Sequence, residues 1–183
     1  MTSGKKTRFL DATEIDRGIA EVLELAGAQG IRVALIGGAA LQLFGSDRLT
    51  KDVDFIADQV VDGLAIEGTL DFGGVKAMTT SGVPVDLVVR DDKYRRLYDA
   101  AINHASRVEG VAALVVPPEY LIAMKMVAGR PKDDADLEFL IAASGVAWDR
   151  ARAVVEEFLG IYAVDELERY RDEVAWRRSR DRD

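Results

Sequence analysis

Two aspartates at alternate positions are the residues in this sequence that most directly suggest chemistry. Asp52 and Asp54 lie in the run Asp-Val-Asp-Phe-Ile, which is predicted to be a β-strand. Residues two apart in a strand project from the same face, so the two carboxylates lie together while Val53 and Phe55 point toward a core. Like charges held this close favour a bound cation, most often Mg²⁺ with oxygen ligands. A lone Asp-x-Asp is also common at solvated strand edges, so the pattern needs support from its neighbours.

Two consecutive glycines lie upstream of these aspartates. The apolar run 33–36 is predicted to be a buried strand, which stops at Gly37 and Gly38 before a short apolar helix at 39–44. Where glycines join a strand to a helix, the bare backbone N–H groups can bind a phosphate. A phosphate-binding turn followed by metal-binding carboxylates is the combination that a nucleoside triphosphate requires, so each weak motif supports the other.

A third aspartate lies in the middle of a later predicted strand. Residues 83–89 alternate, and Asp86 is centred in an otherwise apolar stretch, where a carboxylate is costly to bury alone. Hairpin pairing beside the strand of Asp52 and Asp54 would bring three carboxylates to one face, which makes Asp86 the candidate third metal ligand. A solvated edge aspartate is the alternative. Pro84 indicates that the start of this strand lies at an edge or a bulge.

One lysine interrupts a helix that is otherwise apolar nearly all round. This helix is predicted for residues 119–128 and should be buried, so Lys125 needs an anion or a path to water. Snorkelling to solvent is one alternative. Asp133 and Asp136 follow and share a face of the next predicted helix. A structural role for this cluster, which would hold Lys125 and Arg130 in place, competes with a catalytic one.

The order of these motifs resembles the nucleotidyltransferase superfamily that includes DNA polymerase beta. The similarity is greatest to the AbiEii-type toxin nucleotidyltransferases of bacterial abortive-infection and toxin–antitoxin systems, and it covers about residues 33–140. The residues that carry it are Gly37-Gly38-Ala39, Arg48-x-Thr50-x-Asp52-Val53-Asp54-Phe55 and Arg130-Pro-Lys-Asp-x-x-Asp-Leu.

This resemblance implies an enzyme that moves an NMP group from an NTP to an acceptor hydroxyl and releases pyrophosphate. The glycine turn would position the triphosphate, and the aspartates would bind two Mg²⁺ ions, with Mn²⁺ as a substitute. The lysine in the later helix would contact the phosphates. The implied site residues are the catalytic and metal-binding Asp52, Asp54 and Asp86, the catalytic and nucleotide-binding Lys125, and the nucleotide-binding Gly37, Gly38, Arg48, Thr50, Arg130, Lys132, Asp133 and Asp136.

The composition excludes several other classes of site. The 183 residues include no cysteine and one histidine, His104, so disulfides, thiolate zinc sites and multi-histidine metal sites are excluded. Any metal must therefore bind to carboxylates. The absence of cysteine also fits a cytoplasmic location. No apolar stretch is long enough for a membrane span, and the basic residues near the N-terminus are not followed by the apolar region of a secretory signal.

The expected fold is α/β (α+β), with a small mixed sheet, helices on one face and a C-terminal helical section. Residues 1–117 are expected to form the nucleotidyltransferase core, and residues 118–183 the helical section that completes the nucleotide cleft. The predicted helices also include 14–28, capped by Asp11 or Thr13, and the ranges 92–104, 150–159 and 165–177.

The acceptor is the least defined part of this interpretation. A toxin-type enzyme would modify tRNA or a protein and would be neutralised by an antitoxin, and the resemblance favours this alternative. A net charge of −8 opposes binding of a long nucleic acid and suits a small cationic acceptor, as in an antibiotic-modifying enzyme. Basic clusters at 90–96 and 169–182 are most simply solvated helix faces. A nucleotide-binding module without catalysis is the third alternative.

Overall fold

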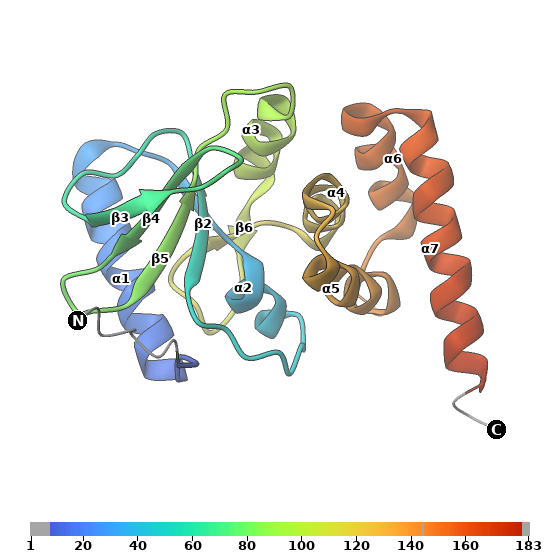
Figure 1. Cartoon of the computed structure of the whole chain (residues 1–183), viewed down its shortest axis with the longest axis horizontal. Coiled ribbons are helices and arrows are strands. Elements are labelled where there is room, and N and C mark those ends of the chain that lie inside the picture. Colours follow the sequence, from blue (N-terminus) through green and yellow to red (C-terminus); the bar gives the residue numbers. More distant parts are fainter. Residues whose placement is uncertain (1–7, 144, 181–183) are drawn as a thin grey trace, which may run out of the picture.

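A mixed sheet of seven strands forms the centre of the described part of this computed structural model. The structure describes residues 8–143 and 145–180, except for the side chains of residues 131 and 132. Helices α4 to α7 gather beside the sheet at one end of the molecule, with α7 outermost (Figure 1). This arrangement confirms the predicted α/β fold with a C-terminal helical section. The strand order is β3-β4-β5-β2-β1-β7-β6. The elements are α1 (Ala12–Gln29), β1 (Val33–Ile36), α2 (Gly37–Leu43), β2 (Val53–Ala57), β3 (Ala65–Thr69), β4 (Gly74–Met78), β5 (Pro84–Val88), α3 (Arg95–His104), β6 (Ser106–Arg107), β7 (Leu114–Val115), α4 (Pro118–Ala128), α5 (Pro131–Ala142), α6 (Trp148–Leu159) and α7 (Ile161–Arg180).

Helix α1 packs on one face of the sheet, and the residues that flank it cap both of its ends. Asp11 accepts the backbone N–H of Glu14, and Glu14 in turn accepts the backbone N–H of Asp11, which completes a capping box. Gly30 ends the helix in the left-handed conformation at φ 68°. A Cβ on Gly18 would lie 2.7 Å from a methyl carbon of Val83, so this glycine lets the helix lie close against the sheet.

The pairing of the central strands sets the positions of the site residues. β1 and β2 are antiparallel, with Ile36 opposite Asp54, whereas β2 and β5 are parallel, with Asp54 opposite Asp86. The expected hairpin between β2 and β5 is therefore wrong. The chain between them forms β3 and β4, and the hairpin partner of β5 is β4. β5 is also an internal strand, and Pro84 is accommodated because it is the first residue, ahead of the pairing with β2 that starts at Val85.

Some element boundaries differ from the predicted ones. α3 begins at Arg95 rather than near residue 92, because the Asp92 carboxylate accepts the backbone N–H of Tyr94 and forms a turn ahead of the helix. α7 begins at Ile161 rather than near residue 165, directly after the glycine that ends α6. None of the described helices combines the length and the apolar character that crossing a lipid bilayer requires.

Candidate active site

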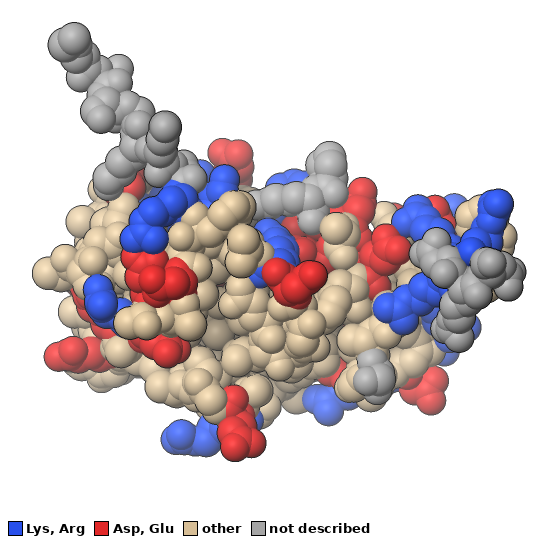
Figure 2. Space-filling model, turned by 90° about the horizontal axis from the view of Figure 1, so that it is seen from below, with Lys and Arg blue, Asp and Glu red and all other residues tan. Residues whose placement is uncertain are grey.

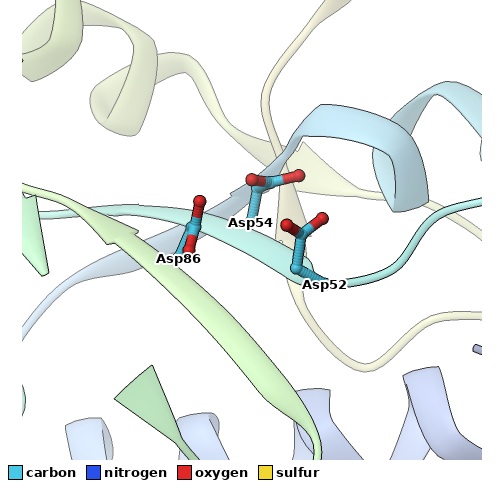
Figure 3. Close-up of side chains that lie close together, drawn as sticks. All are labelled: Asp52, Asp54 and Asp86. Carbon is cyan, nitrogen blue, oxygen red and sulfur yellow. The ribbon is translucent and has the colours of Figure 1, made fainter. Parts of the chain in front are cut away.

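Three carboxylates converge above the centre of the sheet. Asp52, Asp54 and Asp86 project to the same side of two neighbouring strands (Figure 3). One carboxylate oxygen from each lies within 4.8 Å of the other two. On the opposite face, Val53 and Val85 are fully buried in the core, so the strand alternation separates the polar side from the apolar side. Three hard oxygen ligands at this spacing fit the coordination of a divalent cation such as Mg²⁺.

The glycine pair lies directly against the carboxylates. Gly37 has φ 64°, and a Cβ placed on it would lie 1.9 Å from Oδ2 of Asp54. A Cβ on Gly38 would lie 2.7 Å from Oγ1 of Thr50. Both positions therefore exclude a side chain, and Gly37 also needs a backbone conformation that other residues rarely adopt. The helix α2 starts at these glycines, earlier than the predicted start at residue 39.

Thr50 lies behind Asp52 rather than on the surface of the cavity. The threonine is buried, and its Oγ1 donates a hydrogen bond of 2.9 Å to the backbone oxygen of Asp52. The same hydroxyl lies 3.3 Å from Oδ1 of Asp52. Thr50 therefore holds the chain that leads into β2, and its contacts orient Asp52. The resemblance implies that this threonine binds the nucleotide. In the structure Thr50 does not line the cavity but lies behind Asp52.

Five charged side chains form a continuous network along one wall of the cavity, which we call the ion network. Lys125 Nζ lies 2.8 Å from Oδ1 of Asp133 and 2.6 Å from Oδ2 of Asp136. Arg130 Nε lies 2.6 Å from the other oxygen of Asp133, and Arg48 pairs with Asp136. The Lys125 side chain is only 12% exposed, so it reaches anions instead of snorkelling to solvent. The side chain of Lys132, which the resemblance implies to be nucleotide-binding, lies outside the described part of the chain.

Asp136 ties the loop before β2 to α4, which makes its removal costly. Its side chain is 3% exposed and accepts from both Arg48 and Lys125. We expect Asp136→Ala to lower the free energy of unfolding by about 3 kcal/mol, because it leaves a buried ammonium without one of its two partners. Chemical denaturation measures this loss. The matched control is Asp134→Ala, an exposed aspartate of the same helix, for which a loss below about 1 kcal/mol is expected. Equal losses in the two variants would contradict the role of the network.

Asp133 should make the stability of the fold depend on pH. Burial alone would raise the pKa of its carboxyl, but hydrogen bonds from Arg130 and Lys125 outweigh burial and lower the pKa below its ordinary value of 3.8. A carboxyl with a lowered folded-state pKa stabilises the fold above its unfolded-state pKa, and this contribution disappears as the pH falls through the folded-state value. We expect Asp133→Asn to be less stable than wild type near neutral pH, and the difference to shrink once the pH falls below 3.8. Urea unfolding at a series of pH values measures it, and a constant difference would refute this assignment.

The three carboxylates, the glycines and the cations of the ion network, Arg48, Lys125 and Arg130, line one cavity of about 200 Å³ between the sheet and α4. Sequence reasoning missed several residues that line it, among them Phe72, Arg90 and Tyr98. The alternation of β5 carries a signal for Arg90, because Asp86, Val88 and Arg90 follow one another at every second position. Phe72 precedes β4 in a turn, so no periodicity points to it. The full lining is Ile36, Gly37, Gly38, Arg48, Asp52, Asp54, Phe72, Asp86, Val88, Arg90, Tyr98, Leu121, Met124, Lys125, Val127, Ala128 and Arg130.

Comparison with solved structures identifies the class of fold. The chain is similar to the solution structure of the antibiotic-resistance factor ANT(2'')-Ia, with a TM-score of 0.52 and 16% sequence identity over 88% of this chain and 99% of that one. It also resembles the crystal structure of an antigenic nucleotidyltransferase-like protein from Paracoccidioides brasiliensis, with a TM-score of 0.47 and 20% identity over 88% of this chain and 95% of that one. At this level of identity the likeness to ANT(2'')-Ia concerns the fold alone.

The family assignment follows from the sequence match. Residues 13–182 match the DUF6036 family, described as nucleotidyltransferases of unknown function, and the chain belongs to this family. No curated protein matches the chain significantly. The acidic cluster of Asp52, Asp54 and Asp86 is consistent with the divalent metal site that such enzymes use.

Proposed function

We propose that this protein transfers an NMP group from an NTP to an acceptor hydroxyl and releases pyrophosphate. The observation that carries the proposal is the convergence of three carboxylates beside a glycine turn in a cavity that also holds Lys125 and Arg130. In this reaction the acceptor oxygen forms a bond to the α-phosphorus while the bond from that phosphorus to the bridging oxygen of the β-phosphate breaks. The hydroxyl proton leaves to a base, and the pyrophosphate takes the electron pair of the broken bond.

The carboxylates fit a divalent metal by their chemistry. Asp52, Asp54 and Asp86 offer the hard oxygen ligands that Mg²⁺ prefers, and Mn²⁺ accepts the same ligands. We propose that they hold two Mg²⁺ ions, which would supply charge neutralisation at the triphosphate and a lower pKa of the acceptor hydroxyl. Asp86 would accept the hydroxyl proton, because it lies on the side of the cluster away from the glycine turn.

The remaining lining residues would bind the triphosphate. Gly37 and Gly38 leave room for phosphate oxygens to approach the backbone, where any Cβ would fill the space. Lys125, Arg48 and Arg130 would neutralise phosphate charge from the opposite wall. Since two of these cations come from α4 and its C-terminal end, we propose that residues 118–183 complete the cleft against a core of residues 1–117.

The acceptor class separates the finer alternatives. A toxin-type enzyme of the AbiEii kind would modify tRNA or a protein and would have a cognate antitoxin, whereas a small-molecule enzyme would modify a compound such as a cationic antibiotic. Lys and Arg side chains are interspersed with Asp and Glu on the face shown in Figure 2, a surface that does not by itself select a polyanion. Binding of a tRNA acceptor should weaken steeply with salt, and binding of a neutral small acceptor should not.

The decisive experiment uses each α-labelled NTP with Mg²⁺ and total bacterial RNA and protein extract. Label in an RNA or protein band with the wild type, and none with the Asp52→Ala/Asp54→Ala double variant, supports the proposal and identifies the acceptor class. Pyrophosphate release should follow the same pattern. If the double variant labels as strongly as the wild type, the assignment of the aspartates is wrong. NTP binding without pyrophosphate release in any extract would identify a binding module instead of an enzyme.

A further inference from the structure

The cavity continues past Asp86 to an end that the proposed donor site does not use. The order of the strands in the sheet fixes the order of the site residues across it. Gly37 follows β1, Asp54 lies on β2 and Asp86 on β5, and Phe72 precedes β4. Neighbouring strands are about 5 Å apart, so Phe72 and the glycine turn lie on opposite sides of the carboxylates. The cavity therefore has a glycine end and an opposite end.

The opposite end is built from two aromatic rings and one guanidinium group, those of Phe72, Tyr98 and Arg90, and we call it the aromatic–arginine end. The guanidinium carbon of Arg90 lies 5.8 Å from the centre of the Phe72 ring and 5.1 Å from that of Tyr98. Arg130, which the proposed function assigns to the triphosphate, borders this end, and its guanidinium carbon lies 5.5 Å from the same Phe72 ring. The Arg90 side chain is 5% exposed and pairs with Asp92 at 2.6 Å, so it is fixed in place.

Reaction geometry assigns this end to the acceptor. In phosphoryl transfer the attacking and leaving oxygens lie roughly in line on opposite sides of the phosphorus. If the glycine end and Arg48 hold the leaving pyrophosphate, as the proposed function requires, the acceptor approaches from the side of Asp86. The aromatic–arginine end is the part of the cavity on that side.

The chemistry of this end selects among acceptors. Among the described residues that line the cavity, the carboxylates are those of Asp52, Asp54 and Asp86, so a cationic acceptor would find no further counter-charge. The rings of Phe72 and Tyr98 already have a guanidinium beside them, which leaves less of their surface for an ammonium group. Flat bases stack on aromatic and guanidinium planes, and guanidinium groups bind phosphate.

We infer that the acceptor is a nucleotide, free or at the end of an RNA chain, whose base packs against the aromatic–arginine end. This inference rests on the proposed function, because it uses the direction of attack. Phe72 is the most direct contact to test, since it lines the cavity, is only partly buried and has Arg90 and Arg130 on either side.

The test measures acceptor binding separately from donor binding. Wild type is saturated with Mg²⁺ and an α,β-methylene NTP, which cannot be cleaved, and is titrated with AMP, with a short single-stranded RNA of mixed sequence and with the cationic aminoglycoside tobramycin. The variants are Phe72→Leu, which keeps apolar volume without a ring, and Phe72→Tyr, which keeps the ring. The matched control is Phe9→Leu, because Phe9 carries Lys51 at 5.2 Å from its ring centre and does not line the cavity.

The expected result is that a nucleotide probe binds the donor-loaded wild type and that Phe72→Leu weakens this binding about tenfold or more. Phe72→Tyr and Phe9→Leu should bind like wild type, and the affinity for the NTP analogue should be unchanged throughout. AMP binding as tightly as RNA would identify a free nucleotide, and tighter RNA binding would identify a chain end. Loss of affinity for the NTP analogue in Phe72→Leu, or binding of tobramycin but of neither nucleotide probe, would overturn the inference. Failure of wild type to bind the analogue would instead count against the proposed function.

Discussion

Asparagine in place of Asp54 is expected to reduce nucleotidyl transfer about a thousandfold while the fold is retained. The asparagine amide has nearly the volume of the carboxylate, so it fits the same space. Asp86, which lies opposite residue 54 on the neighbouring strand, would lose a neighbouring negative charge. The variant would lack one of the three charged ligands of the proposed metal site, which would supply several kcal/mol of transition-state stabilisation. Each 1.36 kcal/mol of lost stabilisation lowers the rate about tenfold. Pyrophosphate release under saturating NTP measures the effect.

The metal assignment has a separate measurement that does not depend on activity. A ligand that binds only the folded state raises the unfolding temperature, so Mg²⁺ or Mn²⁺ should stabilise wild type. Asp54→Asn should lose most of this stabilisation. Asp62→Asn, a change of the same chemistry at an exposed position, should keep both the stabilisation and the turnover. If the metal stabilises wild type and Asp54→Asn equally, it binds elsewhere.

Alanine at Gly37 is expected to have the second large effect, through a steric clash with the site. The added Cβ would lie 1.9 Å from Oδ2 of Asp54, so the carboxylate must move out of the cluster. A displacement of about 1 Å at a reacting centre can cost about a hundredfold in rate. We expect Gly37→Ala to lose transfer by at least about that factor and to lower the affinity for Mg²⁺ and for the NTP analogue.

Backbone strain is the competing explanation for this effect, and a second glycine separates the two. Gly45 also has a positive φ, 95°, but a Cβ on it would meet nothing within 4 Å. Gly45→Ala should therefore cost only the left-handed backbone penalty of about 1–2 kcal/mol in unfolding free energy and leave transfer near the wild-type rate. Gly37→Ala should be less stable than Gly45→Ala. If both variants lose activity to the same extent, strain is the cause and the contact with Asp54 is irrelevant.

Local sequence patterns predicted which residues converge in the candidate site, because local geometry places them. Asp52 and Asp54 share a face through strand alternation alone, and the glycine pair marks the end of β1. The start of α4 follows from two prolines, and its apolar sequence required a partner for Lys125. These features depend on residues within a few positions of each other, so a single sequence carries them.

Features that depend on the path of the chain could not be obtained in this way. The parallel pairing of β5 with β2 results from two hairpins formed by the intervening segment, and no residue in β5 encodes that direction. The ion pair between Arg48 and Asp136 joins a loop to a helix that lies far away in the sequence, so neither residue predicts the other. Phe72 reaches the cavity from a turn, where side-chain direction follows no period.

The register between β2 and β5 also bears on how accurately the sheet assembles. Along β5, the side chains of Val85 and Leu87 are fully buried, and Asp86 between them faces the cavity. Slippage of this strand by one residue would turn Asp86 into the apolar interior and bring both neighbours out. An ionised carboxylate without a partner there costs several kcal/mol, so the slipped pairing is strongly disfavoured. Asp86, which the proposed reaction uses as a base, therefore also disfavours a misaligned sheet during folding.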